Sequence, residues 1–181
     1  DALTTGICNV AIGINALGAS TTGCFNIAIG DTAMGGAVVT GNHNIIMGQV
    51  AGDALTSGQF NIAMGNEALG VSTTGCHSIA LGYNALGSAD TTGIKNIAIG
   101  HSAGDAMTAG TLNIAIGPGA LGAAQQGVCN TAVGNEALNS SNAVSNHNSA
   151  FGSDAGGGVT TGDNNTHLGQ SAGNNPDVNT T

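Results

Sequence analysis

The sequence predicts an all-β protein: a parallel β-solenoid, of the β-roll or β-helix type, with about ten coils of 17 or 18 residues and little or no helix. Three observations predict this fold. A short motif returns at a nearly constant interval, aliphatic residues alternate with alanine inside each copy, and glycine closes each copy. Such a unit cannot enclose a core alone, but it can stack on the next copy and bury columns of side chains between layers.

The repeat is anchored on the glycine that ends each segment of the type Asn-Ile-Ala-Ile-Gly. Successive anchors lie 17 or 18 residues apart, and the residue three positions after each anchor is alanine in all ten copies. Related variants recur every 52 residues, which indicates blocks of three copies. We expect the anchors to form sharp corners, because glycine tolerates a positive φ. The predicted corner glycines are Gly13, Gly30, Gly48, Gly65, Gly82, Gly100, Gly117, Gly134, Gly152 and Gly169.

Asparagine stands four positions before nine of these anchors, and Ser78 takes this place in the remaining copy. If the coils stack in register, these side chains can hydrogen-bond to one another along the rod and satisfy polar groups at an inward corner. The predicted structural ladder consists of Asn9, Asn26, Asn44, Asn61, Asn96, Asn113, Asn130, Asn148 and Asn165.

The alternation in Ile27-Ala28-Ile29 has the period of two that is typical of a β-strand. A second short strand is expected around Ala68 and Leu69. We predict that the isoleucines fill the core: Ile12, Ile27, Ile29, Ile62, Ile97, Ile99, Ile114 and Ile116. The alanines between them would then form a smooth outer face or tight interior of one rod, or a flat strip on which chains pack side by side, three around a fibre axis.

Composition argues against several classes of partner. Charged residues make up 6% of the chain, Lys95 is the single basic residue, and the formal net charge is −9. Such a surface cannot neutralise a phosphate backbone and would be repelled by anionic lipid, so neither nucleic acid nor membrane contact is expected. The opening residues Asp-Ala-Leu-Thr-Thr-Gly match the interior stretch at 53–58, so residues 1–181 are expected to be one repeat domain within a longer fibrous protein.

The titratable residues do not form a recognisable catalytic or metal-binding motif. His43, His77 and His147 share one repeat position with phenylalanine, lysine, leucine, cysteine and asparagine, and a column that accepts all these types is permissive. The four cysteines lack a Cys-x-x-Cys spacing, so we expect buried thiols, with bonds to other chains as the alternative. Asp53 and Asp105 would lie three coils apart. We therefore predict no catalytic residue, no cofactor and no metal.

The motif Asn-x-Ala-Ile-Gly followed by x-x-Ala, seen in TTGCFNIAIGDTAMG from Thr21, resembles the repeats of trimeric autotransporter adhesin heads. Those heads are left-handed parallel β-rolls that associate as trimers. The longer form, TTG-x-x-N-x-AIG-x-x-ALG, is similar to repeat regions of bacteriophage tail fibres. The resemblance extends over nearly the whole chain and implies an extracellular or virion-borne homotrimer, with other fibre, baseplate or cell-surface components as partners.

The expected function is therefore structural: the shaft of a phage tail fibre or similar fibre that presents a host-binding tip. A bacterial surface adhesin or extracellular filament is the alternative, and an enzyme is not expected. An ice-binding solenoid is a minor alternative, because pairs such as Thr21 and Thr22 could stack into a ladder of hydroxyl groups. Neighbouring residues of a strand point to opposite faces, however, whereas an ice-binding array needs the spacing Thr-x-Thr.

Overall fold

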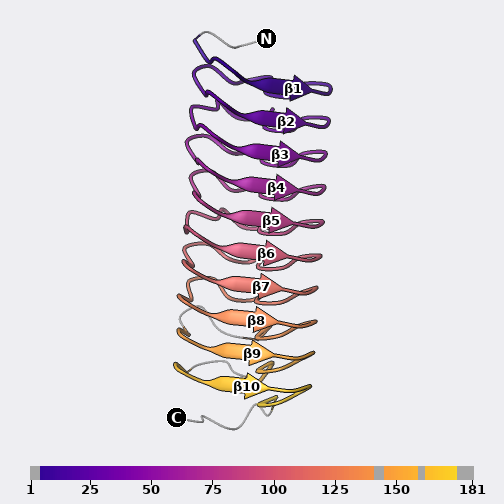
Figure 1. The fold of residues 1–181 in the computed structure, drawn as a ribbon, viewed down its shortest axis with the longest axis vertical. Coiled ribbons are helices and arrows are strands. Elements are labelled where there is room, and N and C mark those ends of the chain that lie inside the picture. Colours follow the sequence, from indigo (N-terminus) through magenta and orange to yellow (C-terminus); the bar gives the residue numbers. More distant parts are fainter. Residues whose placement is uncertain (1–4, 141–144, 159–161, 175–181) are drawn as a thin grey trace.

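The structure is a computed structural model that describes residues 5–140, 145–158 and 162–174, and these residues contain ten short strands and no helix. The strands are β1 (Val10–Ile12), β2 (Ile27–Ile29), β3 (Ile45–Met47), β4 (Ile62–Met64), β5 (Ile79–Leu81), β6 (Ile97–Ile99), β7 (Ile114–Ile116), β8 (Thr131–Val133), β9 (Ser149–Phe151) and β10 (Thr166–Leu168). Each strand pairs in parallel with the next, so one ten-stranded sheet runs from β1 to β10 along the rod (Figure 1). The predicted parallel β-solenoid is confirmed.

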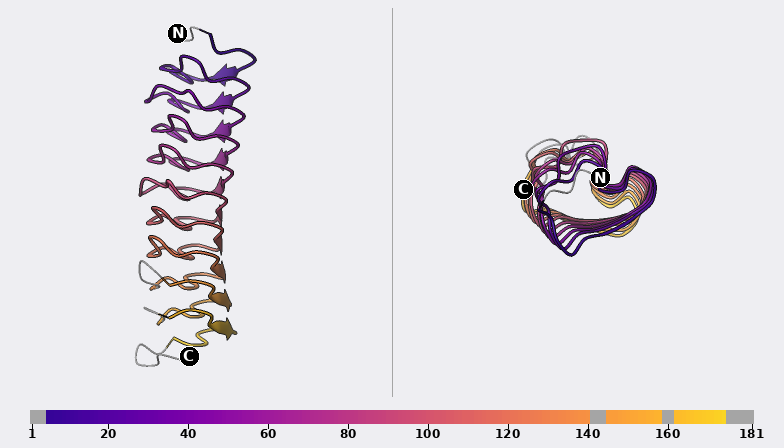
Figure 2. Two further views of the ribbon diagram at one scale, coloured as in Figure 1. Left: turned by 90° about the vertical axis from the view of Figure 1, so that its left-hand side faces the viewer. Right: turned by 90° about the horizontal axis from the view of Figure 1, so that it is seen from above.

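The coils stack in the register that the repeat predicts. Between β6 and β7, for example, Ile97 pairs with Ile114 and Ile99 with Ile116. Because the register is kept across all nine strand pairs, each position of the repeat becomes a column of side chains parallel to the rod axis. Seen from the end, the coils superimpose in one narrow outline, with the strands along one side (Figure 2). The helix-free described ranges also contain no segment that could cross a membrane as a helix.

The asparagine ladder is present and passes through the interior. Asn113 shows the pattern: its side-chain oxygen accepts a hydrogen bond from the backbone N–H of Asn130 at 2.9 Å, and its amide donates to the carbonyl of Gly127 at 2.7 Å. Within the described residues, the eight asparagines from Asn9 to Asn148 each make these two hydrogen bonds to the next coil. Ser78 continues the ladder with a single hydrogen bond to the next coil, in which its hydroxyl oxygen accepts from the N–H of Asn96 at 3.3 Å.

The ten corner glycines all have a positive φ, between 114° and 143°. Nine of them also lie directly against the next coil. A Cβ built on Gly65, for instance, would come within 3.0 Å of the carbonyl oxygen of Gly82, closer than real Cβ atoms approach backbone. Two separate constraints therefore favour glycine at these corners: the positive φ and the close approach of the next coil.

The prediction for the core isoleucines is wrong. The alanine in the middle of a typical strand is fully buried, as Ala28 and Ala115 are, whereas the flanking isoleucines point away from the core. Those predicted to lie inside are instead partly or largely exposed: Ile27, Ile29, Ile62, Ile97 and Ile114 are half-buried, and Ile12, Ile99 and Ile116 are exposed. Alternation separates two faces without saying which is inside, and this coil is too thin to hold large side chains from both of its walls.

The large interior side chains come from the turn opposite the sheet. In six of the ten copies, a large apolar residue directly follows the alanine that stands three positions after the anchor. These residues are buried: Leu17, Met34, Leu69, Leu86, Leu121 and Leu138. The second strand expected around Ala68 and Leu69 is absent, because these residues lie in a turn and Leu69 has a φ of 52°. Alanine on the sheet wall and leucine on the turn wall therefore share the narrow interior.

One variant coil shows how tightly this space is shared. In β3 the buried alanine is replaced by Ile46, and the position of the usual turn leucine is occupied by Gly52. A Cβ on Gly52 would lie 3.3 Å from Cγ2 of Ile46, so the two residues are close across the interior. Glycine also takes this turn position at Gly104 and Gly156, in copies whose strand has alanine in the middle. Leu55, a few residues later, is fully buried and adds apolar volume to the same coil.

Candidate functional site

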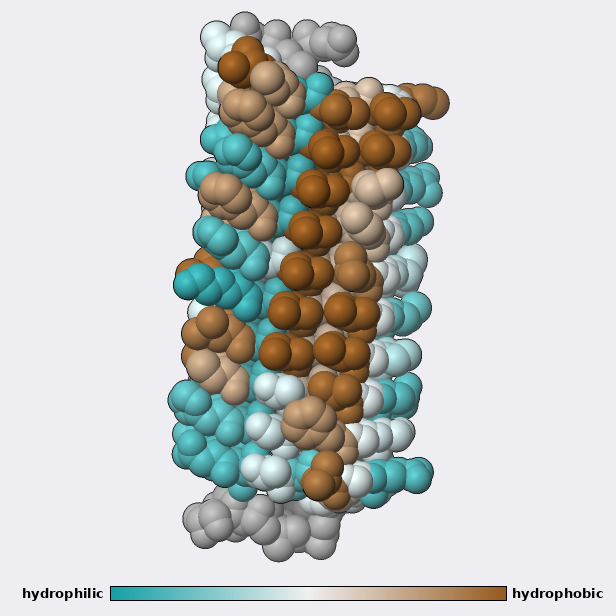
Figure 3. All heavy atoms as spheres, in the orientation of Figure 1, coloured by the Kyte–Doolittle hydropathy of each residue, from teal (hydrophilic) through white to brown (hydrophobic). Residues whose placement is uncertain are grey.

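The most distinctive surface of the rod is the outward side of the sheet. We call it the sheet face and define it as the first and third residues of each strand. The first residues are Val10, Ile27, Ile45, Ile62, Ile79, Ile97, Ile114, Thr131, Ser149 and Thr166. The third residues are Ile12, Ile29, Met47, Met64, Leu81, Ile99, Ile116, Val133, Phe151 and Leu168. These side chains form two apolar columns side by side along the rod (Figure 3).

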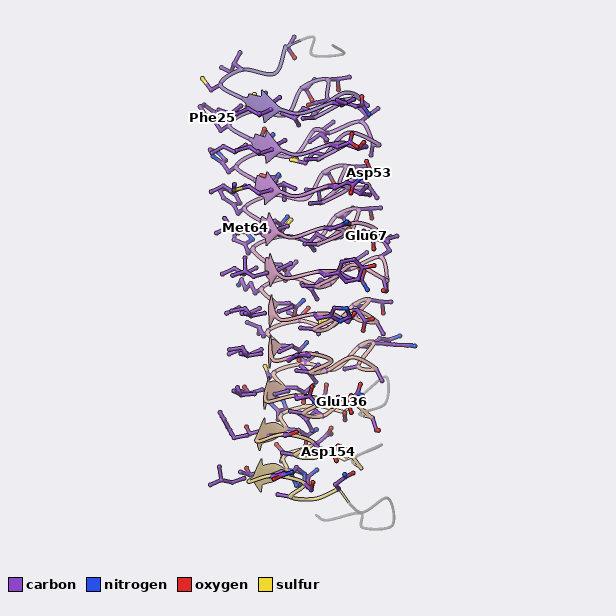
Figure 4. The ribbon with its side chains drawn as sticks, turned by 90° about the vertical axis from the view of Figure 1, so that its right-hand side faces the viewer. Phe25, Asp53, Met64, Glu67, Glu136 and Asp154 are labelled. Atoms are coloured by element: carbon purple, nitrogen blue, oxygen red, sulfur yellow. The ribbon has the colours of Figure 1, made fainter. Side chains whose placement is uncertain are left out.

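The sheet face contains no charged residue. Acidic side chains gather on another side of the rod, where Asp53, Glu67, Glu136 and Asp154 lie opposite Met64 and its neighbours (Figure 4). They come from the turns that follow four of the corner glycines, Gly48, Gly65, Gly134 and Gly152. These four acidic side chains therefore lie apart from the apolar sheet face.

Two titratable groups on the acidic side have shifted pKa values. Burial raises the pKa of the Asp105 carboxyl above its ordinary value, against the opposing effect of hydrogen bonds from the backbone and from Ser88. The negative charge of Glu67, with a hydrogen bond to it, raises the pKa of the Tyr83 phenol. The Tyr83 ring also stacks on His101, with ring centroids 5.1 Å apart.

The raised pKa of Asp105 predicts a pH-dependent stability. The folded chain binds this proton more tightly than the unfolded chain, so the carboxyl destabilises the fold progressively as pH rises through the folded pKa. We expect Asp105→Asn to raise the thermal midpoint at neutral pH and to have no such effect well below the ordinary aspartate value of 3.8. Asp31→Asn removes the same formal charge from an exposed position and separates burial from net charge. An Asp105→Asn variant that is less stable than the wild type at neutral pH would contradict this reading.

The histidines that sequence analysis singled out do not gather into a site. His43 lies between Phe25 and Phe60, and His77 continues the column, with ring centroids 5.0 to 5.1 Å apart and nearly parallel planes at His43. The column that looked merely permissive is thus a ladder of stacked rings over four coils. Its signal in the sequence is the alternation of phenylalanine and histidine at one repeat position. His147 is exposed in the same column farther along.

The four cysteines are free thiols, and two of them have a structural role. The sulfur of Cys24 accepts a hydrogen bond from the N–H of Ile7 in the preceding coil, and the sulfur of Cys76 accepts from the N–H of Gln59. Asn42 uses its amide oxygen at the same repeat position, accepting from the N–H of Cys24. The thiols therefore serve as acceptors that join neighbouring coils, a role that sequence analysis missed. Contrary to the expectation of burial, Cys8 is exposed and the other three are intermediate.

No cluster of three or more histidine, cysteine, aspartate or glutamate side chains that could hold a metal ion occurs within residues 5–140, 145–158 and 162–174. Three threonine pairs lie wholly within the described residues, and in each of them the second threonine is the more exposed. Thr22, Thr74 and Thr92 are exposed, while Thr21 and Thr73 are half-buried and Thr91 is buried. The two threonines of each pair therefore differ in exposure and do not present a flat double array at these coils.

Comparisons with known protein families, with curated proteins and with solved structures find no match to this chain. The architecture alone, a parallel β-solenoid made of repeated coils, is consistent with the resemblance to fibre repeats.

Proposed function

We propose that this chain is the structural shaft of an extracellular or virion-borne fibre, such as a phage tail fibre, which holds a host-binding tip at a distance. The observation that carries the proposal is the uninterrupted stack. Ten strands follow one another in one parallel sheet, and the asparagine ladder links the same coils through the interior. A stack of this kind converts the number of repeats directly into length.

The geometry also explains how such a shaft can grow by duplication. Parallel strands stack at about 4.8 Å, so each coil adds that length and a 52-residue block of three coils adds roughly 14 Å. Outside the interior columns, the repeat accepts different residues. The repeat position of the stacked rings, for example, is occupied by His77, Lys95 and Leu112 in consecutive coils. Duplication therefore preserves the fold provided that the corner glycines, ladder asparagines and small core residues are retained.

Within this proposal the shaft is a homotrimer attached to other fibre, baseplate or cell-surface components. Each sheet face carries two apolar columns, so one copy can offer one column to each of two neighbours around a common axis. A bacterial adhesin or extracellular filament would use the same shaft. A membrane-anchoring barrel or sorting signal next to the repeat would favour the adhesin, and a baseplate-binding segment or trimerising tip would favour the phage fibre.

Deletion of residues 66–117 tests the proposal, because it removes one 52-residue block and joins two equivalent repeat positions. We expect a folded rod with unchanged cross-section, shortened by roughly 14 Å in small-angle X-ray scattering. Loss of the rod shape would contradict a modular shaft. Hydrolysis of a polysaccharide by the intact chain, abolished by substitution of a histidine or aspartate in this segment, would contradict a purely structural role.

A further inference from the structure

The sheet face exposes more apolar surface than a monomeric rod of this size needs to expose. Eight of its side chains each leave between 36% and 78% of their surface in solvent: Val10, Ile12, Met47, Met64, Ile99, Ile116, Phe151 and Leu168. Together they expose on the order of 700 Å² of apolar surface, above the roughly 300–600 Å² of the largest patch on a typical monomer and close to the roughly 800 Å² per partner of a stable interface.

We propose that the sheet face is the surface on which copies of this chain meet, lying side by side in the same direction with equal coils at equal height. The inference rests on the proposed function, because it names the contact and the direction of packing inside the shaft. It also replaces the alanine strip considered from the sequence, since Ala28 and its equivalents are buried inside the rod.

The spacing of the sheet face favours another copy as the occupant. Its side chains protrude in rows about 4.8 Å apart over ten strands. Such a surface packs best against another surface whose rows have the same spacing. A second copy has that spacing along its full length. With equal coils at equal height, the row of Ile97 and Ile99 then meets the equivalent row of the neighbour at the same level, as side chains pack between facing sheets.

The position of several acidic residues lowers the electrostatic cost of self-association. Each chain has a formal net charge of −9, which opposes the approach of a second copy. The acidic side chains Asp53, Glu67, Glu136 and Asp154 lie on the side of the rod away from the sheet face, however (Figure 4). Copies that meet through the sheet face therefore keep these charges in solvent, where salt screens their repulsion.

The composition of the sheet face changes along the rod and thereby sets the direction of packing. The first strand position is valine or isoleucine from β1 to β7 and becomes Thr131, Ser149 and Thr166 in β8, β9 and β10. This change is visible as the paler lower end of one column (Figure 3). Parallel copies place the hydroxyl-bearing coils at one level, whereas fully overlapped antiparallel copies would bury the apolar β1 to β3 against them.

A pair of lysine substitutions tests the contact. In Ile62→Lys/Ile97→Lys, both changes are on the sheet face and two coils apart, and we expect self-association at least roughly 100-fold weaker because unpaired charges are costly to bury at an interface. Ser57→Lys/Thr92→Lys adds the same charges at exposed positions of the same coils, outside the sheet face, and should associate like the wild type. Analytical ultracentrifugation measures both. Ile62→Thr/Ile97→Thr is a milder variant that uses a residue already present at this position, Thr131, and circular dichroism checks that each variant is folded.

A compact globular domain fused before Asp1 tests the direction. Negative-stain electron microscopy is expected to show every fused domain at the same end of each particle. Domains at both ends of one particle, equal association of the sheet-face and control variants, or a wild-type chain that stays single at high concentration would each overturn the inference. A block deletion that still shortens the rod would support a modular shaft in each of these cases, although a wild-type chain that stays single would also exclude the trimeric form of that shaft. The modular shaft and the sheet-face contact can therefore fail separately.

Discussion

Gly65→Ala is expected to destabilise the rod by about 3 kcal/mol or more. The residue has a φ of 139°, and forcing a side chain into such a conformation costs about 1–3 kcal/mol. The new Cβ would also come within 3.0 Å of the carbonyl oxygen of Gly82, so coils four and five must separate at the point where they are most closely packed. Chemical denaturation followed by far-ultraviolet circular dichroism measures the loss.

Gly169→Ala is the matched control, because the two sites differ in stacking. Gly169 is also a corner glycine, with a φ of 114°, but among the described residues no atom lies within 4 Å of a Cβ placed there. Only the dihedral cost of about 1–3 kcal/mol should apply. Equal losses in the two variants would contradict the claim that close stacking of the coils restricts the corners to glycine.

Asn113→Leu is expected to cost about 2–5 kcal/mol although the two side chains are similar in size. Asn113 is almost fully buried, and its removal leaves the N–H of Asn130 and the carbonyl of Gly127 without their partner inside the rod. Each unsatisfied buried group costs about 1–3 kcal/mol. The free energy of unfolding from denaturant titration checks this value.

Asn113→Ser should be less harmful, because the rod already accepts serine in the ladder. Ser78 accepts a hydrogen bond from the N–H of Asn96, so a serine at 113 can keep the acceptor and lose only the amide donor. We expect about half of the cost of the leucine variant. If the leucine variant were as stable as the wild type, the ladder would not be what joins the coils.

Much of this architecture could be predicted from the spacing of the repeat alone. A constant interval means that equal positions stack, so Asn26 had to lie over Asn44 and Gly30 over Gly48 once the solenoid was assumed. The asparagine then needed partners at the stacking distance, and its backbone and side-chain contacts supply them. Periodicity thus predicts which residues share a column, and the chemistry of a column predicts its role.

The inside and outside of the sheet could not be assigned in the same way. Ile99 and Ala98 alternate whichever of them faces the core, and hydrophobicity favours the wrong choice. The deciding factor is the opposite wall, where Leu86 and Met107 already fill the thin interior. The close contacts of Gly52 with Ile46 and of Gly173 with His167 show that residues on the two walls share the same space.

The backbone of the turns was equally inaccessible to pattern reasoning. Phe25, Thr32 and Met34 all have a positive φ, a conformation that costs a residue other than glycine roughly 1–2 kcal/mol. In this conformation their N–H groups bond to carbonyl oxygens of adjacent coils, Phe25 to Ile7 for example. Hydrogen bonds between coils stabilise a backbone conformation that these residue types disfavour. The residues themselves therefore do not indicate the positive φ in the sequence. The sheet face could not be predicted from the sequence either, because its outward direction follows from the burial of the alanines in the middle of the strands.

The mass and length of the purified chain in solution test the central claim, a shaft of copies joined side by side, most directly. Light scattering combined with small-angle X-ray scattering should give three times the 17.3 kDa of one chain in a particle no longer than a single rod, about 43 Å for the nine steps between the ten strands. A mass of 17.3 kDa at high concentration would contradict the account. A larger mass in a particle two or three times as long would also contradict it, because the copies would then be joined end to end.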